Sequence, residues 1–575
     1  MKRYWKYIRP YIQYYILGPC FMMMEVVGDV LLPYMLAKII NQGIAERNVA
    51  YIIKIGAIMG LIAVIMAVGG VLGAWFASKA AMNFGADLRM DLFEKIQQFS
   101  FQNIDNFSTG SLITRLTNDI TQIQNMIMMT LRMCLRSPGI LIGAMVMAFV
   151  ISPKLAAIFI IVLPVLAVLI VVIMRRAFPQ FRTLQEKLDA LNSCIQEGLV
   201  GIRLIKSFVR GDYEEMRFEK RNQQLKEANL TAMKTMLLYT PLMTLALNIT
   251  TVVVVWSGGN MIVAGNMQVG DLTAFTNYIV QIMSSLTMLS IAFLNWARAI
   301  ASFHRVGEVL DEKIDLTDEN AKHKDRAVCE GSVEFQNVSF RYYKNSPEWV
   351  IENISFKLEA GKTLGIIGST GSGKSTLVSM IPRLYDTDEG TVLVDGINVR
   401  DYGLKPLREG IGMVLQNNTL FSGSITENLK WGDEHADEKA VRKAAQNAQA
   451  VGFIDSFKDG YRTRLEQSGN NVSGGQKQRL CIARALLKCP KILILDDSTS
   501  AVDTATERAI REALHSEYKD MTKIIIAQRI RSVMDADEIL VLDNGKTAGF
   551  GTHEQLLADC PVYREIYDVQ NGREE

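Results

Sequence analysis

Long apolar segments dominate the first half of this 575-residue sequence, while short or alternating apolar runs dominate the second half. A helix needs about 20 apolar residues to cross a bilayer. Segments that approach or exceed this length occur near 14–39, 56–82, 137–152, 155–174, 236–264 and 272–296. The first is interrupted by Glu25 and Asp29, and the third is short. The pattern predicts six membrane-spanning helices.

Lys and Arg are distributed unevenly around these segments. They are frequent in 83–136 and 175–234, whereas 258–271 has none and 152–154 has only Lys154. Short connections that carry Lys and Arg stay on the cytoplasmic side of a membrane. We therefore expect a multi-pass protein of the cell membrane whose two long connections, termini and final domain are cytoplasmic.

Both long connections show helical periodicity over roughly 50 residues. At about 1.5 Å per residue, such helices would extend well beyond the bilayer. Turn-like sequences interrupt them at Asn106-Phe-Ser-Thr-Gly and at Phe208-Val-Arg-Gly-Asp-Tyr. These turns are expected either to contact a cytoplasmic domain or to be ordinary helix–turn–helix connections.

The second half has the pattern of a soluble α/β domain. Apolar and polar residues alternate around Val333, Phe335 and Val338, as in a strand at the edge of a sheet. Runs that are apolar after their first residues, at 362–368, 491–496 and 523–527, are typical of buried parallel strands. A polar, charged segment precedes them. We therefore expect a transmembrane domain at 1–310, a linker at 311–331 and a nucleotide-binding domain at 332–575.

The chemistry of this domain begins with a phosphate-binding loop. Glycines in such a loop let backbone N–H groups point at phosphate oxygens, the lysine carries charge to the β- and γ-phosphates, and the hydroxyl that follows it binds Mg²⁺. Asp496, at the end of an apolar strand, is expected to hold the same Mg²⁺ through water. ATP and Mg²⁺ are the predicted cofactors. The loop consists of Gly368, Ser369, Thr370, Gly371, Ser372, Gly373, Lys374, Ser375 and Thr376.

A second motif makes the class more specific. The sequence Val472-Ser-Gly-Gly-Gln-Lys-Gln-Arg resembles the signature of ATP-binding-cassette (ABC) proteins. With the P-loop and the predicted spans, the whole chain resembles a half-transporter of the type IV exporter class, similar to bacterial multidrug ABC exporters. The resemblance implies a membrane α-helical domain of six long spans followed by an α/β P-loop domain of the ABC ATPase type.

The resemblance also assigns roles to single residues. Tyr342 matches the aromatic residue that stacks on adenine. Gln416 matches the glutamine that senses Mg²⁺, so the implied metal ligands are Ser375, Gln416 and Asp496. The remaining implied nucleotide contacts are the signature residues Ser473, Gly474, Gly475 and Gln476, and Asp503 in the D-loop Ser500-Ala-Val-Asp.

Two positions depart from the family pattern and concern catalysis. Asp497 stands where a glutamate orients the attacking water, and it is one methylene shorter. Gln528 stands where a histidine contacts the γ-phosphate, and an amide cannot carry the positive charge. A general base must lie within hydrogen-bonding distance of the water from which it takes a proton. The sequence therefore predicts a site that binds ATP and hydrolyses it slowly.

In this family each ATP lies between the P-loop of one nucleotide domain and the signature of the other. The expected partner is a second half-transporter, a different chain that keeps the glutamate and histidine; a homodimer that tolerates both changes is the alternative. The expected function is ATP-driven efflux of amphiphilic or drug-like compounds. The competing hypothesis is an ATP-gated channel or regulatory membrane subunit. A net charge of +2 gives no reason to expect a nucleic-acid partner.

Glu25 and Asp29 are candidate substrate contacts. They are one helical turn apart in the first predicted span, so they share a face. Carboxylates in a bilayer are costly and face a polar cavity or a partner charge. They are expected either to contact cationic substrates or to form a structural pair with neighbouring helices.

Overall fold

The computed structural model describes residues 2–344, 346–498 and 502–571, and the chain forms two compact units. The helical unit comprises Met1–Gln97 and Gly110–Asp311. The α/β unit comprises Glu312–Glu575 together with the short segment Gln98–Thr109, which comes from the first long connection.

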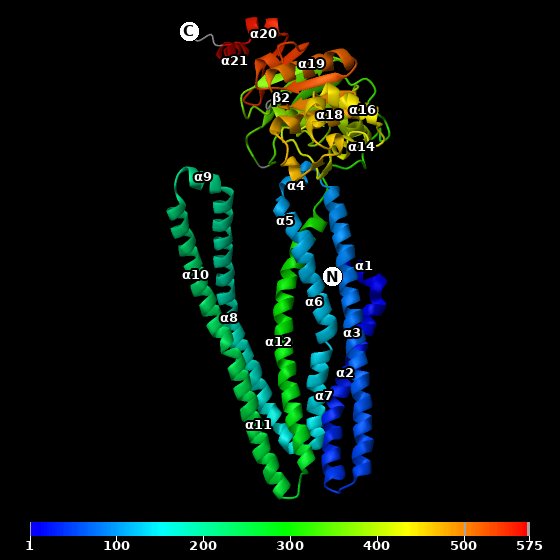
Figure 1. Cartoon of the computed structure of the whole chain (residues 1–575), viewed down its shortest axis with the longest axis vertical. Coiled ribbons are helices and arrows are strands. Elements are labelled where there is room, and N and C mark those ends of the chain that lie inside the picture. The colour runs from blue at the N-terminus through cyan, green and yellow to red at the C-terminus, as the bar shows by residue number, and fades with distance from the viewer. Residues whose placement is uncertain (1, 345, 499–501, 572–575) are drawn as a thin grey trace. The chain divides into compact units, whose positions relative to one another are not determined.

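The helical unit is built from long helices that run side by side (Figure 1). Short helical turns at Lys2–Tyr4 and Arg9–Tyr11, together with α1 (Trp5–Ile8), precede the first long helix. Two segments, Ile39–Ile44 and Arg115–Asp119, are π-helical. The other helices are α2 (Ile12–Lys38), α3 (Val49–Gln97), α5 (Thr109–Thr114), α6 (Ile120–Met133), α7 (Arg136–Ile151), α8 (Pro153–Val200), α9 (Ile202–Ser207), α10 (Gly211–Leu237), α11 (Tyr239–Val263) and α12 (Val269–Asp311).

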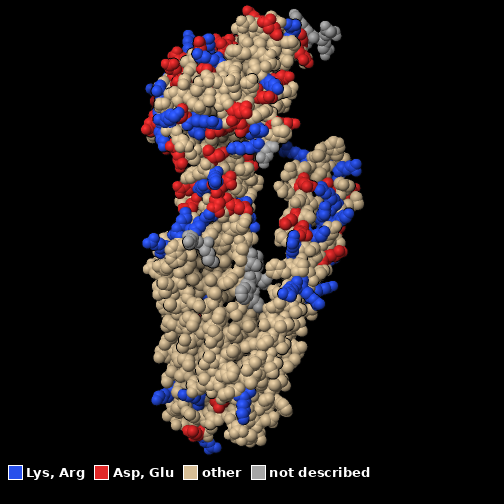
Figure 2. All heavy atoms as spheres, turned by 180° about the vertical axis from the view of Figure 1, so that it is seen from behind, with Lys and Arg blue, Asp and Glu red and all other residues tan. Residues whose placement is uncertain are grey.

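Five stretches of the described chain are long and apolar enough to cross a membrane, and they contain the first five predicted spans, apart from the last residue of the third and of the fifth. The sixth predicted span, 272–296, lies within α12, a helix of 43 residues. On the face that Figure 2 presents, a broad surface of the helical unit lacks charged residues and is bordered by them. The predicted fold class is confirmed. The five stretches are Trp5–Ile44, Val49–Gln97, Thr109–Ile151, Pro153–Val200 and Gly211–Val263.

Small residues allow the first two long helices to approach closely. A Cβ atom on Gly69 would lie 3.1 Å from the carbonyl oxygen of Phe21, and one on Gly73 would lie 3.1 Å from that of Gly18. Close backbone contact of this kind is typical of helix packing in lipid, where burial of apolar area gives little driving force. This packing fixes the face of α2 that carries Glu25 and Asp29.

Both long connections are interrupted where the sequence predicts turns. Asn106–Ser108 separates α4 (Phe101–Asp105) from α5, and Phe208–Arg210 separates α9 from α10. Val209, with φ of 53°, has a left-handed backbone, a conformation that ends regular helix. Helices α8 and α10 then pack along each other (Figure 1).

The α/β unit contains a six-stranded sheet in the order β12-β11-β3-β10-β9-β6. All neighbouring strands in it are parallel except β11 and β12, which form an antiparallel hairpin. Both faces of the central strands are buried, as their apolar sequences predict. The strands are β3 (Thr363–Gly368), β6 (Ile411–Val414), β9 (Ile492–Asp496), β10 (Thr522–Ile526), β11 (Glu538–Asp543) and β12 (Lys546–Gly551).

The described part of the α/β unit also contains a four-stranded antiparallel sheet in the order β2-β1-β4-β5 and a two-stranded sheet formed by β7 and β8. Because β3, β9 and β10 are parallel, their carboxyl ends meet at one edge, where ligands bind in open α/β sheets. These strands are β1 (Val333–Phe340), β2 (Ile351–Leu358), β4 (Glu389–Val394), β5 (Ile397–Asn398), β7 (Gly423–Ser424) and β8 (Arg464–Leu465). The helices besides α4 are α13 (Lys374–Ser379), α14 (Leu404–Glu409), α15 (Ile425–Leu429), α16 (Glu438–Asn447), α17 (Val451–Ser456), α18 (Gly474–Leu487), α19 (Thr504–Glu517), α20 (His553–Asp559) and α21 (Pro561–Asn571).

Candidate functional site

A cavity of about 310 Å³ lies at the carboxyl ends of β9 and β10 and beside the loop that follows β3. Twelve of its fourteen lining residues are ones that the sequence analysis singled out; the other two are Val350 and Ile526. The twelve are Tyr342, Thr370, Gly371, Ser372, Gly373, Lys374, Ser375, Thr376, Gln416, Asp496, Asp497 and Gln528.

The loop between β3 and α13 has the backbone geometry of a phosphate cradle. Gly371 and Gly373 have φ of 87° and 88°, a region that side chains disfavour. At Gly373 a Cβ atom would also lie 2.6 Å from Cγ2 of Ile351. The Lys374 Nζ donates to the carbonyl oxygens of Gly368 (2.9 Å) and Ser369 (2.7 Å), which do not themselves line the cavity. The shape and the lysine fit a bound phosphate chain.

The predicted metal ligands meet in the same cavity. The Ser375 hydroxyl donates to Oδ1 of Asp496 at 2.9 Å, and Asp496 is 3% exposed. Burial raises the pKa of the Asp496 carboxyl, and the Ser375 hydrogen bond opposes the shift. Burial also lowers the pKa of Lys374. A hydroxyl and a carboxylate are the oxygen ligands that Mg²⁺ prefers, so Ser375 and Asp496, with Gln416 nearby, would hold that ion.

The two residues that depart from the family pattern contact each other. Gln528 donates from Nε2 to Oδ2 of Asp497 at 2.9 Å. Asp497 has φ of 47°, an uncommon conformation for a residue other than glycine. Burial raises the pKa of the Asp497 carboxyl, against the opposing effects of Lys374 and of hydrogen bonds from Gln528 and Gln416. The short carboxylate is therefore held by amide groups beside the P-loop lysine.

Tyr342 forms one wall of the cavity. Its hydroxyl lies 2.8 Å from Oγ1 of Thr376, so the ring is positioned against the P-loop. The ring also packs edge-on against Phe340 and Tyr385.

The signature residues lie elsewhere on the α/β unit and do not line this cavity. Ser473 caps α18 and accepts from the backbone N–H of Gln476 at 3.3 Å, and Gly474 and Gly475 form the first turn. Asp503 caps α19, where hydrogen bonds from Thr506 lower the pKa of its carboxyl. The D-loop residues Ser500 and Ala501 lie outside the described residues.

In the helical unit, Glu25 and Asp29 share one cationic partner, Arg136. One of its terminal nitrogens lies 2.8 Å from Oε1 of Glu25 and 3.4 Å from Oδ2 of Asp29. The three side chains, called here the intramembrane triad, are 23%, 27% and 35% exposed in the order Glu25, Asp29 and Arg136. No sequence pattern pointed to Arg136 as the partner of these carboxylates. Its position immediately before the third predicted span is the feature that could have indicated it.

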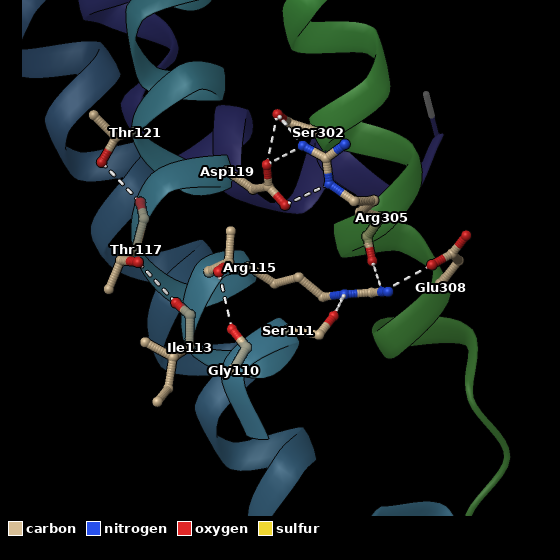
Figure 3. A network of polar contacts seen from close by, with 11 residues as sticks. Gly110, Ser111, Ile113, Arg115, Thr117, Asp119, Thr121, Ser302, Arg305 and Glu308 are labelled. Carbon is tan, nitrogen blue, oxygen red and sulfur yellow. Dashed lines mark hydrogen bonds and ion pairs between the residues drawn. The ribbon is translucent and has the colours of Figure 1, made fainter. Parts of the chain in front are cut away.

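A second charge cluster ties α12 to the π-helical segment Arg115–Asp119 (Figure 3). Asp119 is fully buried, and its carboxylate accepts from Ser302 at 2.9 Å and from both Nε (2.8 Å) and a terminal nitrogen of Arg305. Arg115 pairs with Glu308 at 2.8 Å and donates to the carbonyl oxygen of Arg305. We call these five residues the cytoplasmic clasp. Nothing in the local sequence pattern predicted it.

A P-loop cavity in a parallel sheet, joined in one chain to helices of membrane-spanning length, defines a membrane protein that binds nucleotide. Family models agree on both halves: residues 15–286 match the ABC transporter transmembrane region, and residues 351–500 match the ABC transporter domain. The chain belongs to the ABC transporter family. Its nucleotide-binding domain is therefore an ATPase that is cytoplasmic in this fold and hydrolyses ATP in coupling to transport.

Relatives and a solved structure extend this assignment over the whole chain. It is 39% identical to the uncharacterized ABC transporter ATP-binding protein YfiB of Bacillus subtilis (strain 168), over all of this chain and 99% of YfiB. It is 33% identical, over 99% of each chain, to YgaD of the same organism, whose name assigns it provisionally to multidrug export as an ATP-binding/permease protein. A bacterial Atm1-family ABC exporter solved with ATP bound has the same fold, with a TM-score of 0.81, 24% identity and 98% coverage of each chain.

Proposed function

We propose that this ABC exporter chain is one half of a heterodimeric pump for amphiphilic, drug-like compounds, and that its own ATP site hydrolyses slowly. The observation that carries the proposal is the contact between Asp497 and Gln528 in an otherwise complete nucleotide cavity. The multidrug name of the relative YgaD supports the class of substrate.

Slow hydrolysis follows from the chemistry of the two residues. A general base must reach the attacking water, and Asp497 reaches less far than a glutamate would. The hydrogen bond from Gln528 occupies one of its carboxylate oxygens, and the amide carries no charge for the γ-phosphate. Lys374, Ser375 and Asp496 remain suited to binding Mg-ATP.

The placement of the signature supports a partner. Ser473 to Gln476 do not line this chain's cavity, and Ser473 and Gly474 are exposed. They are therefore accessible to the ATP site of a second chain. A partner that keeps the glutamate and histidine would supply the active base, and this chain would complete that site with its signature.

The intramembrane triad supports cationic substrates. Two carboxylates and one guanidinium leave one negative charge, which is costly in a bilayer unless a cation balances it. Nε of Arg136 is buried and has no hydrogen-bond partner among the described residues, so the cluster is not fully satisfied. We infer that Glu25 and Asp29 contact the positive group of an amphiphilic substrate.

The test compares two substitutions in the reconstituted heterodimer, one that affects this chain's own ATP site and one that affects the ATP site of the partner. The ATPase rate and the transport of a dye are the readouts. Removing a working general base lowers a rate by about 10²–10⁴. Ser473→Ala, which acts on the partner's site, should nearly abolish turnover, whereas Asp497→Asn should change it little. Equal losses would show that Asp497 is a functioning base and would overturn the proposal. Brisk ATPase activity of this chain alone, abolished by Lys374→Ala, would overturn it too.

The same contact between Asp497 and Gln528 favours one other function, an ATP-gated channel or regulatory subunit in which binding alone moves the helices. ATP hydrolysis that rises with substrate concentration in the reconstituted protein supports the pump. Substrate flux that needs ATP but continues when hydrolysis is blocked supports the channel.

A further inference from the structure

Three aromatic rings form a continuous cluster at the Tyr342 wall of the nucleotide cavity. Phe340, Tyr342 and Tyr385 pack with ring centroids 5.1 to 5.5 Å apart, the two pairs that include Tyr342 in edge-on geometry. Tyr342 lines the cavity, whereas Tyr385 does not. Tyr385 therefore lies one ring further from the nucleotide site.

The other side of Tyr385 contacts α4, the short helix within the α/β unit that comes from the first long connection. The Tyr385 hydroxyl donates to Oδ2 of Asp105 at 2.8 Å, and the ring of Phe101 packs edge-on at 5.9 Å. Burial raises the pKa of Tyr385, and the Asp105 hydrogen bond adds to the shift. Tyr385 therefore stays protonated and keeps its donor at any physiological pH.

The backbone that carries Tyr385 is fixed from several sides. Arg383 has a left-handed φ of 51°, and its guanidinium makes two hydrogen bonds to Asp386 at 2.9 and 3.2 Å. Arg408 donates to the carbonyl oxygens of Pro382 (3.1 Å) and Arg383 (2.8 Å). Side chains held by such a network transmit displacement because close-packed interiors yield little.

Helix α4 is also tied to the chain that enters the α/β unit. Asn103 is buried, forms a capping box with Ser100, and donates from Nδ2 to Oε1 of Glu312 (3.1 Å) and to the carbonyl oxygen of Lys313 (2.9 Å). Residues 312 and 313 directly follow α12 in the chain. Helix α4 is thereby hydrogen-bonded to the two residues that follow α12 in the chain.

We propose that Tyr385 is a positioning residue that transmits nucleotide occupancy from Tyr342 to α4 through its hydrogen bond to Asp105. The inference rests on the proposed function, because it assumes that Tyr342 contacts the base of the bound nucleotide. A base stacked on Tyr342 restricts the orientation of that ring and hence of the Tyr385 ring that packs against it. The hydroxyl of Tyr385 then holds Asp105, and with it α4, in one place.

The test measures hydrogen exchange of residues 98–109 in the purified full-length protein, with and without saturating Mg²⁺ and a non-hydrolysable ATP analogue. Tyr385→Phe keeps the ring and removes only the hydroxyl. Tyr343→Phe is the matched control, since the neighbouring Tyr343 is 77% exposed. Nucleotide affinity is measured in parallel for each variant. A double variant, Tyr385→Phe with Asp105→Ala, completes a cycle that isolates the pair.

We expect nucleotide to slow exchange at 98–109 in the unaltered protein and in Tyr343→Phe. In Tyr385→Phe the protection should fall by at least about twofold, the effect of losing one hydrogen bond, while nucleotide affinity stays unchanged. Asp105→Ala should match it, and the double variant should lose no more. Full protection in Tyr385→Phe would overturn the inference, as would nucleotide binding without any change at 98–109. If the unaltered protein bound no nucleotide, the proposed function itself would fail.

Discussion

Two charge clusters in the same helical unit differ in how completely their charges are satisfied. In the cytoplasmic clasp, two arginines face two carboxylates, and the fully buried Asp119 accepts from Arg305 and Ser302. In the intramembrane triad, one arginine serves two carboxylates, neither carboxylate is fully buried, and Nε of Arg136 has no partner among the described residues.

The difference indicates different roles. A buried ion pair is tolerated when geometry and extra hydrogen bonds offset the loss of solvation, and removing one member leaves an unpaired buried charge. The clasp meets this condition and is a structural joint between α12 and the segment before α6. The triad does not meet it, and an incomplete polar cluster in a membrane is where a ligand is expected to bind.

The largest effect is expected from Asp119→Ala. This change removes the buried acceptor that Arg305 and Ser302 share. Because the Arg305 side chain is 46% exposed and water can solvate it, we expect a loss of about 2 kcal/mol, the cost of hydrogen bonds left unmade. Denaturant unfolding in detergent micelles measures the loss. Thr121→Ala, which changes an exposed threonine two residues further along the chain, is the control. If the two variants were equally stable, the clasp would have no structural role.

Lysine substitutions separate geometry from charge in the two clusters. Lysine keeps the charge but cannot form the two-pronged contact that Arg305 makes with Asp119. Arg305→Lys should therefore lower the free energy of unfolding by about 1 kcal/mol, a value reduced because the Arg305 side chain is 46% exposed. Arg136→Lys should lower it by less than about 0.5 kcal/mol, because Arg136 meets both carboxylates through a single terminal nitrogen, a contact that a lysine can also make. A larger loss at Arg136 would reverse our assignment of roles.

Removing both carboxylates of the triad should affect transport more than stability. The double change Glu25→Gln and Asp29→Asn takes the net charge of the cluster from −1 to +1, so uptake of a cationic dye into inverted vesicles should fall about tenfold, equivalent to 1.4 kcal/mol. Transport of an uncharged dye should be unchanged, and Glu46→Gln, on the connection between α2 and α3, serves as control. Normal cation transport together with a normal melting temperature would rule out substrate contact.

The smallest effect is expected at an ordinary surface pair. Arg182 and Glu186 lie 3.3 Å apart on α8, with side chains 83% and 63% exposed. Glu186→Gln should change the free energy of unfolding by less than about 0.5 kcal/mol, because solvent screens such pairs. This variant sets the baseline for both clusters. A loss comparable to that of Asp119→Ala would mean that burial does not control these energies.

Local sequence was enough to predict the fold class, most of the spans and much of the nucleotide cavity. A span needs an uninterrupted apolar segment, and a phosphate cradle needs glycines and a lysine at fixed spacing, so both leave a mark within a few residues. Seven P-loop residues and Asp496 were predicted from such local patterns, whereas the resemblance to ABC exporters supplied the other four, Tyr342, Gln416, Asp497 and Gln528. Sequence also identified Glu25 and Asp29 as residues in need of a partner.

Only the tertiary structure decided what those residues meet. Arg136 is 111 positions from Glu25, Arg305 is 186 from Asp119, and Tyr385 is 280 from Asp105. Such pairs depend on which helix faces which and in what register, and no periodicity within one helix records that choice. The sequence determined that the chain has membrane spans and an ATP-binding domain; helix packing decided which charges are fully paired and which share a single partner.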